Sequence, residues 1–304
     1  MQILMRKFYW VILPLLVGCS MFHSQDGNTD SLAGLQALEN KKTSSSANEG
    51  GTSKIREMAL KETALSVGAQ SALAVRAKSI DDQLMRQSKY LDTIYDFNAL
   101  VLEHNVLPPV LLEGRNTLNL ADTQTIRISD RVYKVSKQAH FVTTSPNWRQ
   151  YLWMDYKKPE PPHLTLLPKD KEERAIWVHY VTKGWQNGVE QANTILEENI
   201  ARIKEDFNGM ILYRKLLAMN MVTPPYVSHT DLGITGDETE IHIDDKVLRI
   251  TALPVLNMNS SEWKAALAKD EKALEQFNDL EKKVDSAKIK LPAQSWHPII
   301  SSMN

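Results

Sequence analysis

Two long stretches of helical periodicity, each ended by a Pro-Pro pair, constrain the fold of this chain most strongly. In residues 55–105 apolar side chains recur near the 3.6-residue period, and a second helical stretch occupies residues 170–220. Proline has no amide hydrogen to offer a helix interior, so Pro108-Pro109 and Pro224-Pro225 should end both stretches. We therefore expect two long helices. The apolar positions that define the first are Met58, Leu65, Leu73, Leu84, Leu91, Ile94 and Leu102.

Two segments with the alternation of β-strands come after the proline pairs. Residues 125–135 (TIRISDRVYKV) and 240–250 (EIHIDDKVLRI) each predict a short β-hairpin. The turn of the first is assigned to Ser129-Asp130, and Asp244-Asp245 is interpreted as turn chemistry, because aspartate bonds its own backbone in turns. A last helix is expected over residues 261–287. The predicted fold class is α+β, with long helices and short β-hairpins.

The same parts recur in the same order, which indicates an internal repeat. IRISDRVYKVS (126–136) and IHIDDKVLRIT (241–251) align without a gap at an offset of 115. The helix and Pro-Pro matches have offsets of 110 and 116, so a chance likeness of common parts is an open alternative. Our interpretation is two pseudo-repeated helix–hairpin–helix units.

The repeat predicts structural roles for two pairs of residues. Asp130 matches Asp245 and Trp148 matches Trp263, all at the offset of 115. We expect the aspartates to shape the hairpins and the tryptophans to pack each hairpin against the helices. Stacking of a tryptophan on a ligand is the alternative.

The N-terminus has the pattern of a bacterial lipoprotein signal. Two basic residues precede an apolar stretch (8–17) of the length found in secretory signals. The stretch ends in LVGC (16–19), which resembles a lipobox, so we expect cleavage between Gly18 and Cys19 and lipid attachment to Cys19. This cysteine is the only one in the sequence and has no disulfide partner. Ser20 in place of aspartate favours the outer membrane in known sorting behaviour. An ordinary secretory signal and an uncleaved anchor are the alternatives.

Composition divides the rest of the chain. Residues 41–54 are rich in Ser, Asn, Gly, Thr and Lys and are expected to form a flexible tether. Leu32, Leu35 and Leu38 within the same region have helical spacing and predict either a brief helix or a docking peptide for a partner. The expected segments are a signal peptide (1–18), a tether (19–54), a first α+β unit with a Pro-rich connector (55–168), a second α+β unit (169–290) and a tail (291–304).

Motifs for catalysis, cofactors and metals are missing from the sequence. The net charge of −1, which becomes −3 once Arg6 and Lys7 leave with the signal, argues against nucleic-acid binding. The eight histidines form no His-Glu-x-x-His motif, and no nucleophile elbow or phosphate-binding glycine loop is present. Calcium binding by residues 236–245 is an alternative without the spacing of an EF-hand. We expect no catalytic residue, no cofactor and no metal.

The motifs together resemble a known family. The lipobox at Cys19, the Ser-rich tether, GWQNGVEQANTILEENIARIKEDFNGMILYRKLL (184–217) and VTPPYVS (222–228) resemble the DotC/TraI lipoproteins of Dot/Icm type IVB secretion and IncI-type conjugation systems. The resemblance implies a structural subunit on the periplasmic face of the outer membrane that supports export of effector proteins. It implies DotD-like, DotH-like, DotG-like and DotF-like partners and several copies in a ring-shaped hetero-oligomer. From the family only the lipid-bearing cysteine is carried over, here Cys19.

Two other classes of function stay open. A binding lipoprotein for a small ligand would need a cleft with polar groups between the two units. An envelope enzyme would need a converging set of acid, base or metal ligands, which the sequence does not display.

Overall fold

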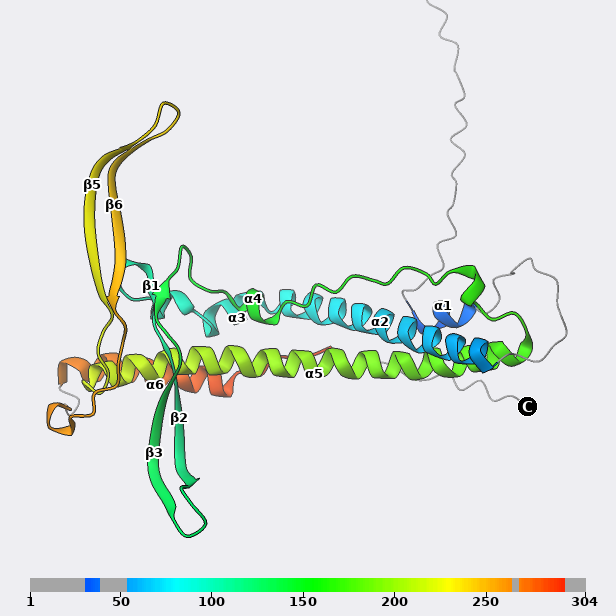
Figure 1. The fold of residues 1–304 in the computed structure, drawn as a ribbon, viewed down its shortest axis with the longest axis horizontal. Helices are drawn as coiled ribbons and strands as arrows, with labels where there is room; N and C mark the ends of the chain where they lie inside the picture. The colour runs from blue at the N-terminus through cyan, green and yellow to red at the C-terminus, as the bar shows by residue number, and fades with distance from the viewer. Residues whose placement is uncertain (1–30, 39–53, 264–267, 293–304) are drawn as a thin grey trace, which may run out of the picture.

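The computed structural model describes residues 31–38, 54–263 and 268–292, and two long helices form its axis (Figure 1). α2 (Lys54–Arg86) and α5 (Lys171–Ala218) pack along most of the length of α2. Arg56 contacts Glu173 at one end of the pair, and Arg76 Nε donates to Asn193 Oδ1 at 3.0 Å further along. Both contacts join residues 117 positions apart, so the two helices run parallel.

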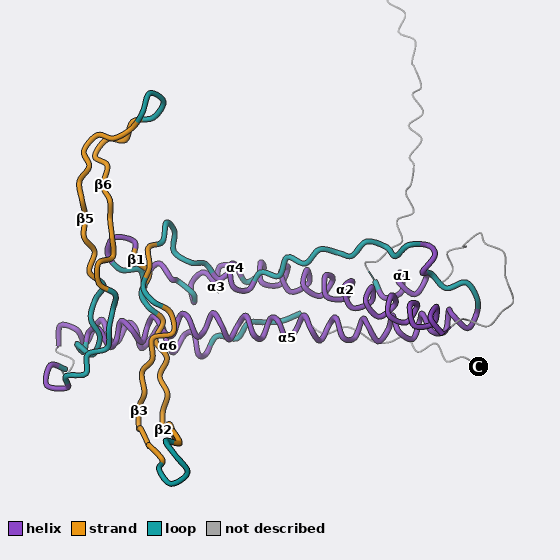
Figure 2. The backbone as a smooth tube through the Cα atoms, in the orientation of Figure 1, coloured by secondary structure: helices purple, strands orange, loops and turns teal. Residues whose placement is uncertain are grey.

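A parallel pair needs a long return connection. After the first strands, the chain passes through α4 (Trp148–Leu152) and then follows the helices back as a loop with one short 3-10 turn, η4 (Leu164–Leu166) (Figure 2). This is the Pro-rich connector expected from the sequence, and it places the start of α5 beside the start of α2 (Figure 1).

Small residues let α2 and α5 approach closely. A Cβ atom on Gly184 would lie 2.3 Å from the carbonyl oxygen of Leu65, and one on Gly188 would lie 2.2 Å from that of Ala69. Neither distance leaves room for a side chain, because atoms at van der Waals contact are about 3.5–4 Å apart. The helix pair therefore depends on glycine at these positions.

The hydrophobic core extends along the helix pair in three clusters. The first, near the start of the pair, is formed by α1 (Leu32–Ala37), α2 and α5 around Trp177. The second contains Phe97, Trp148 and Phe207, and the third lies near the end of α5 around Tyr213. The core contains small side chains as well as large ones, since Ala64, Ala72 and Ala192 are fully buried.

The first helical stretch is shorter than its periodicity predicts. α2 and α3 (Ser88–Ile94) are followed by two 3-10 turns, η2 (Phe97–Leu100) and η3 (Glu103–Asn105), instead of helix up to residue 105. His104 and Asn105 have φ values of 60° and 56°, which an α-helix cannot contain. Met58, one of the expected core positions, is 69% exposed. The second stretch agrees with α5, and the last helix is α6 (Ala268–Ser286), preceded by η5 (Ser260–Glu262).

Two β-ribbons leave the helical body near the end of α5. Ribbon 1 consists of the antiparallel strands β2 (Val110–Leu120) and β3 (Ile126–Lys137), and ribbon 2 of β5 (Tyr226–Gly236) and β6 (Ile241–Ala252). A third, very short pair joins β1 (Val106–Leu107) to β4 (His140–Phe141). Ribbons 1 and 2 project to opposite sides of the helix pair (Figures 1 and 2).

The α+β class with long helices and short β-hairpins is confirmed, but the positions predicted for the hairpins are wrong. Residues 125–135 and 240–250 do not fold back on themselves. Each is one strand of a longer ribbon, and the partner strand begins directly after the Pro-Pro pair. Ser129 and Asp130 lie inside β3, where Ser129 pairs with Thr117. The alternation was visible in the sequence, but nothing local shows with which segment a strand pairs.

The second aspartate pair also lies inside a strand. Asp244 has a φ of +58° at an irregularity in the pairing of β6, and Asp245 accepts a 2.6 Å hydrogen bond from Thr235 Oγ1. Aspartate tolerates the left-handed conformation better than most residues. Asp244 uses this tolerance at a bulge within a strand, and not in a hairpin turn as predicted.

The ribbons correspond closely in sequence, whereas the helices do not. β5 repeats the bounds of β2 at an offset of 116 and β6 those of β3 at 115, because the ribbon 2 turn is one residue shorter. However, the first DFN motif (96–98) lies at a 3-10 turn, and the second (206–208) lies within α5. The duplication therefore stays a prediction. The helices of both halves share one body instead of building two separate packed units.

Trp148 and Trp263 are not equivalent. Trp148 is fully buried in α4, and its Nε1 donates to Asp92 Oδ1 at 2.6 Å. Trp263 is 43% exposed, and its Nε1 donates to the carbonyl oxygen of Asn257 at 3.0 Å. The equal roles predicted from the repeat are wrong, since only Trp148 belongs to the core.

Candidate interaction surfaces

The residues predicted for lipid attachment and cleavage, Cys19 and Gly18, lie outside the described residues. Across the described ranges, no helix is long and apolar enough to cross a membrane. The same ranges hold no group of three or more side chains suited to binding a metal ion. The candidate sites are therefore the end of the body nearest the N-terminus, one cavity and the two ribbons.

The short helix α1 is docked on the chain's own body. Leu35 is fully buried, and its carbonyl oxygen accepts a 3.0 Å hydrogen bond from Trp177 Nε1. Gln36 Nε2 donates to Thr182 Oγ1 at 3.0 Å. Of the two alternatives for the leucine patch, the structure has the helix, and its apolar face contacts α2 and α5.

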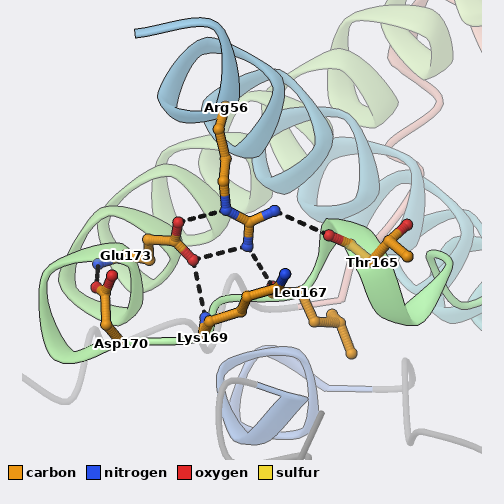
Figure 3. A network of polar contacts seen from close by, with 6 residues as sticks. All are labelled: Arg56, Thr165, Leu167, Lys169, Asp170 and Glu173. Atoms are coloured by element: carbon orange, nitrogen blue, oxygen red, sulfur yellow. Dashed lines mark hydrogen bonds and ion pairs between the residues drawn. The ribbon is translucent and has the colours of Figure 1, made fainter. Parts of the chain in front are cut away.

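An ion pair ties the starts of α2 and α5 together (Figure 3). Arg56 donates from Nε and Nη2 to the two carboxylate oxygens of Glu173, at 2.5 and 2.8 Å. It also donates to the carbonyl oxygens of Thr165 and Leu167, at 3.0 and 3.2 Å. One guanidinium therefore holds α2, α5 and the connector between them, as the planar five-donor group of arginine allows.

Glu173 is the more buried partner of this pair. Burial by itself would raise the pKa of Glu173, but the hydrogen bonds from Arg56 and the Lys169 amide outweigh it and hold the pKa below its ordinary value. The pKa of Arg56 is raised by the same hydrogen bond. Asp170 caps α5 by accepting from the Glu173 amide at 2.7 Å.

A second buried carboxylate lies at the root of ribbon 1. Lys137 Nζ donates to both oxygens of Asp206, at 2.7 and 2.6 Å, and the Tyr151 hydroxyl donates to Oδ2 at 2.8 Å. Burial, followed by this hydrogen bond, raises the pKa of Tyr151. Tyr151 also stacks on Phe97 with ring centroids 5.6 Å apart. The group links β3, α4 and α5.

A cavity of about 380 Å³ opens beside this group. Its polar lining includes Lys137, His140, Tyr151, Arg202 and Asp206. Lys137, Tyr151 and Asp206 already bond one another, so their polar atoms do not await a ligand. No local pattern in the sequence predicts this cavity, because its lining residues extend from Leu107 to Met210.

The tips of both ribbons carry exposed apolar side chains. On ribbon 1, Leu118 is 70% and Ile128 72% exposed, and on ribbon 2, Ile234 is 74% and Ile243 75% exposed. The predicted structural residues Asp130 and Asp245 lie in the same ribbons, away from the core. An isolated two-stranded ribbon is only marginally stable in water. Exposed apolar patches such as these are typical of surfaces that contact another protein.

The architecture defines a non-globular helical body that presents protruding β-ribbons. The profile of a family described as "Type IV secretory system, conjugal DNA-protein transfer" (T4SS_TraI) matches residues 54–265, which is most of the chain. The chain belongs to this family, and the resemblance found in the sequence is confirmed at that level. It is a component of a type IV secretion system and works with the other subunits of that system. No curated protein matches the chain.

Proposed function

We propose that the chain is an outer-membrane lipoprotein and a structural, non-catalytic subunit of the secretion system's core complex. In this proposal Cys19 carries the lipid, and the body brings DotH-like subunits to the outer membrane together with a DotD-like lipoprotein. DotG-like and DotF-like subunits complete a ring-shaped assembly through which effector proteins are exported. Family membership and the lipobox support the proposal.

The observation that carries it is the separation between the anchored end and the ribbons. Cys19 precedes Ser31 by 12 positions, so the linking segment spans at most about 40 Å. From Glu173 to Asp206 the axis of α5 rises about 50 Å, at roughly 1.5 Å per residue. The body thus acts as an arm that is held by one end and offers the ribbons at the other.

The first test separates the anchor from the arm. In Cys19→Ser we expect the protein to leave the outer-membrane fraction while keeping its fold by circular dichroism. The DotH-like subunit should leave that fraction with it. Ser20→Ala is the matched control, because it changes the neighbouring residue and keeps the thiol. Ser20→Asp should move the protein to the inner membrane.

An unchanged distribution of the DotH-like subunit in Cys19→Ser would contradict the scaffolding role. Unchanged membrane attachment of the variant itself would contradict the lipid anchor. The two results are distinguishable, because the first is the membrane distribution of the DotH-like subunit and the second is that of this chain.

A binding lipoprotein for a small ligand is the second candidate, and the cavity beside Lys137 and Asp206 favours it. Arg202 lines this cavity and donates to the Tyr151 carbonyl and the neutral Asn199 side chain, so its guanidinium suits an acidic ligand. Arg202→Ala should then lower ligand affinity without changing how the subunit assembles. If core complexes from the variant instead lose this subunit, the surface serves assembly.

A further inference from the structure

The apolar side chains at each ribbon tip share one face. In ribbon 1, Leu118 pairs with Ile128 and Leu120 with Ile126, and directly paired residues of an antiparallel ribbon point to the same side. Both pairs lie two positions apart along their strands, so all four side chains form one patch. All four are well exposed.

Ribbon 2 has an equivalent patch. Ile234 pairs with Ile243, and Ile241 pairs with Gly236 two positions further along, so the three isoleucines share a face. They match Leu118, Ile128 and Ile126 of ribbon 1 under the offsets of 116 and 115. The two ribbons therefore present apolar faces of similar position and extent.

The net charges of the ribbons are opposite. Ribbon 1 (110–137) has five basic and three acidic side chains and a net charge of +2. Ribbon 2 (226–252) has two basic and six acidic side chains and a net charge of −4. Contact between a ribbon 1 and a ribbon 2 is attractive, whereas contact between two copies of ribbon 2 brings like charges together.

The two ribbons of one molecule cannot meet, because they project to opposite sides of the helix pair (Figure 1). We propose that the tip of ribbon 1 in one copy packs against the tip of ribbon 2 in a second copy, with the apolar faces in contact. The partner is thus a second copy of this chain. A contact between two different surfaces is heterologous and joins copies head to tail into a ring or a filament.

This inference deepens the proposed function, on which it rests only for the expectation of several copies per assembly. The contact itself involves no lipid. It also explains why two marginally stable ribbons carry exposed leucine and isoleucine side chains at their tips, where the body cannot cover them.

Cross-linking between differently tagged copies tests the proposal. Ile128→Cys is placed in one copy and Ile243→Cys in the other, and the lipidated full-length proteins are purified in detergent, mixed and oxidised. We expect a mixed disulfide dimer at a yield at least tenfold above either homodimer. A chain with both substitutions should give a ladder of higher oligomers. The control pair is Met58→Cys and Met258→Cys, which are exposed but lie outside the ribbons.

Electrostatic complementarity has its own readout. Glu238→Lys with Glu240→Lys in the Ile243→Cys copy should lower the mixed yield at least fivefold. Arg127→Glu with Arg131→Glu in the Ile128→Cys copy should then restore it. If neither charge change alters the yield of mixed dimer, the opposite charges of the ribbons do not determine that ribbon 1 contacts ribbon 2.

Several outcomes overturn the proposal. They are homodimers in equal yield, no product above the Met58/Met258 control, and, in cells, a product with another subunit in place of the mixed dimer. Repeating the experiment in Cys19→Ser distinguishes the two proposals. If the mixed dimer persists in Cys19→Ser while the protein leaves the membrane, both the lipid anchor and the ribbon contact are supported. If the mixed dimer is lost only in Cys19→Ser, the contact is not independent of the lipid.

Discussion

Lys137 and Asp206 join ribbon 1 to the longest helix through a forked contact, with Lys137 Nζ 2.7 and 2.6 Å from the two carboxylate oxygens. Asp206 is the nearly buried partner, and Lys137 is half exposed. Without this contact the ribbon root would be held mainly by apolar packing of Leu111, Tyr133 and Val135 against the end of α5. The ion pair thus fixes the direction in which ribbon 1 leaves the body.

Asp206→Asn should loosen ribbon 1 at its root. The amide keeps the shape and one acceptor for Tyr151 but loses the charge that pairs with Lys137, at a cost of about 2 kcal/mol. We expect faster hydrogen exchange in β2 and β3 and a lower urea midpoint. Glu205→Gln is the control, because Glu205 is the exposed neighbour on the same helix. Equal effects of the two changes would mean that the contact does not hold the ribbon.

Gly184→Ala and Gly188→Ala should each destabilise the helix pair. Alanine is more favourable than glycine in a helix by about 1 kcal/mol, so either change would stabilise an isolated helix. Here the added Cβ would lie 2.3 or 2.2 Å from a backbone oxygen of α2, and the helices must separate at a net cost of about 2 kcal/mol.

Thermal unfolding measures this effect. Asn187→Ala is the matched control, since Asn187 is exposed on α5 between the two glycines. Its Tm should stay the same or rise slightly, whereas both glycine variants should fall by several degrees. Glycine variants that are as stable as the control would show that the helices are not in contact at these points.

The helices could be predicted from the sequence, and the strand pairing could not. Helix periodicity is a local pattern, so α5 was predicted almost to its ends. Large apolar residues mark the buried stripe of α2 only in part, because the contact with α5 also uses alanine and glycine. β2 shows only weak alternation, so nothing local marked it as the partner of β3. Likewise, only the fold brings Asp206, Tyr151 and Lys137 together.

The Arg56–Glu173 pair should make stability depend on pH. The pKa of Glu173 lies below its ordinary value of 4.5 in the folded protein, so the unfolded state binds its proton more readily. The contribution is therefore present above about pH 4.5 and is lost as the pH falls through the folded pKa.

Glu173→Gln removes this dependence. At neutral pH the variant should be less stable by about 2 kcal/mol, and the gap to the native protein should narrow at about pH 3. Urea midpoints at the two pH values give the comparison. Glu57→Gln is the control, because it breaks the exposed pair with Lys61 and should leave the urea midpoint almost unchanged at both pH values. A gap that stays constant with pH would assign the loss to packing and not to charge.

In the proposed lipoprotein, the docking of α1 sets how far the body can lie from Cys19. Leu35 is fully buried against the body, so Leu35→Asp would place a charge with no partner in an apolar site, and α1 should detach. The sequence separation between Cys19 and the first docked residue would then grow from 12 positions at Ser31 to 35 positions at Lys54. Ala37→Asp, on the exposed side of α1, is the control. Hydrogen exchange of the Leu35 and Leu38 amides, together with Trp177 fluorescence, reports the detachment.

Since the proposed arm needs a short link to the membrane, Leu35→Asp should also weaken recruitment of the DotH-like subunit while lipid attachment continues. Normal recruitment with α1 detached would show that the lipid alone is sufficient and that the fixed length of the link has no role.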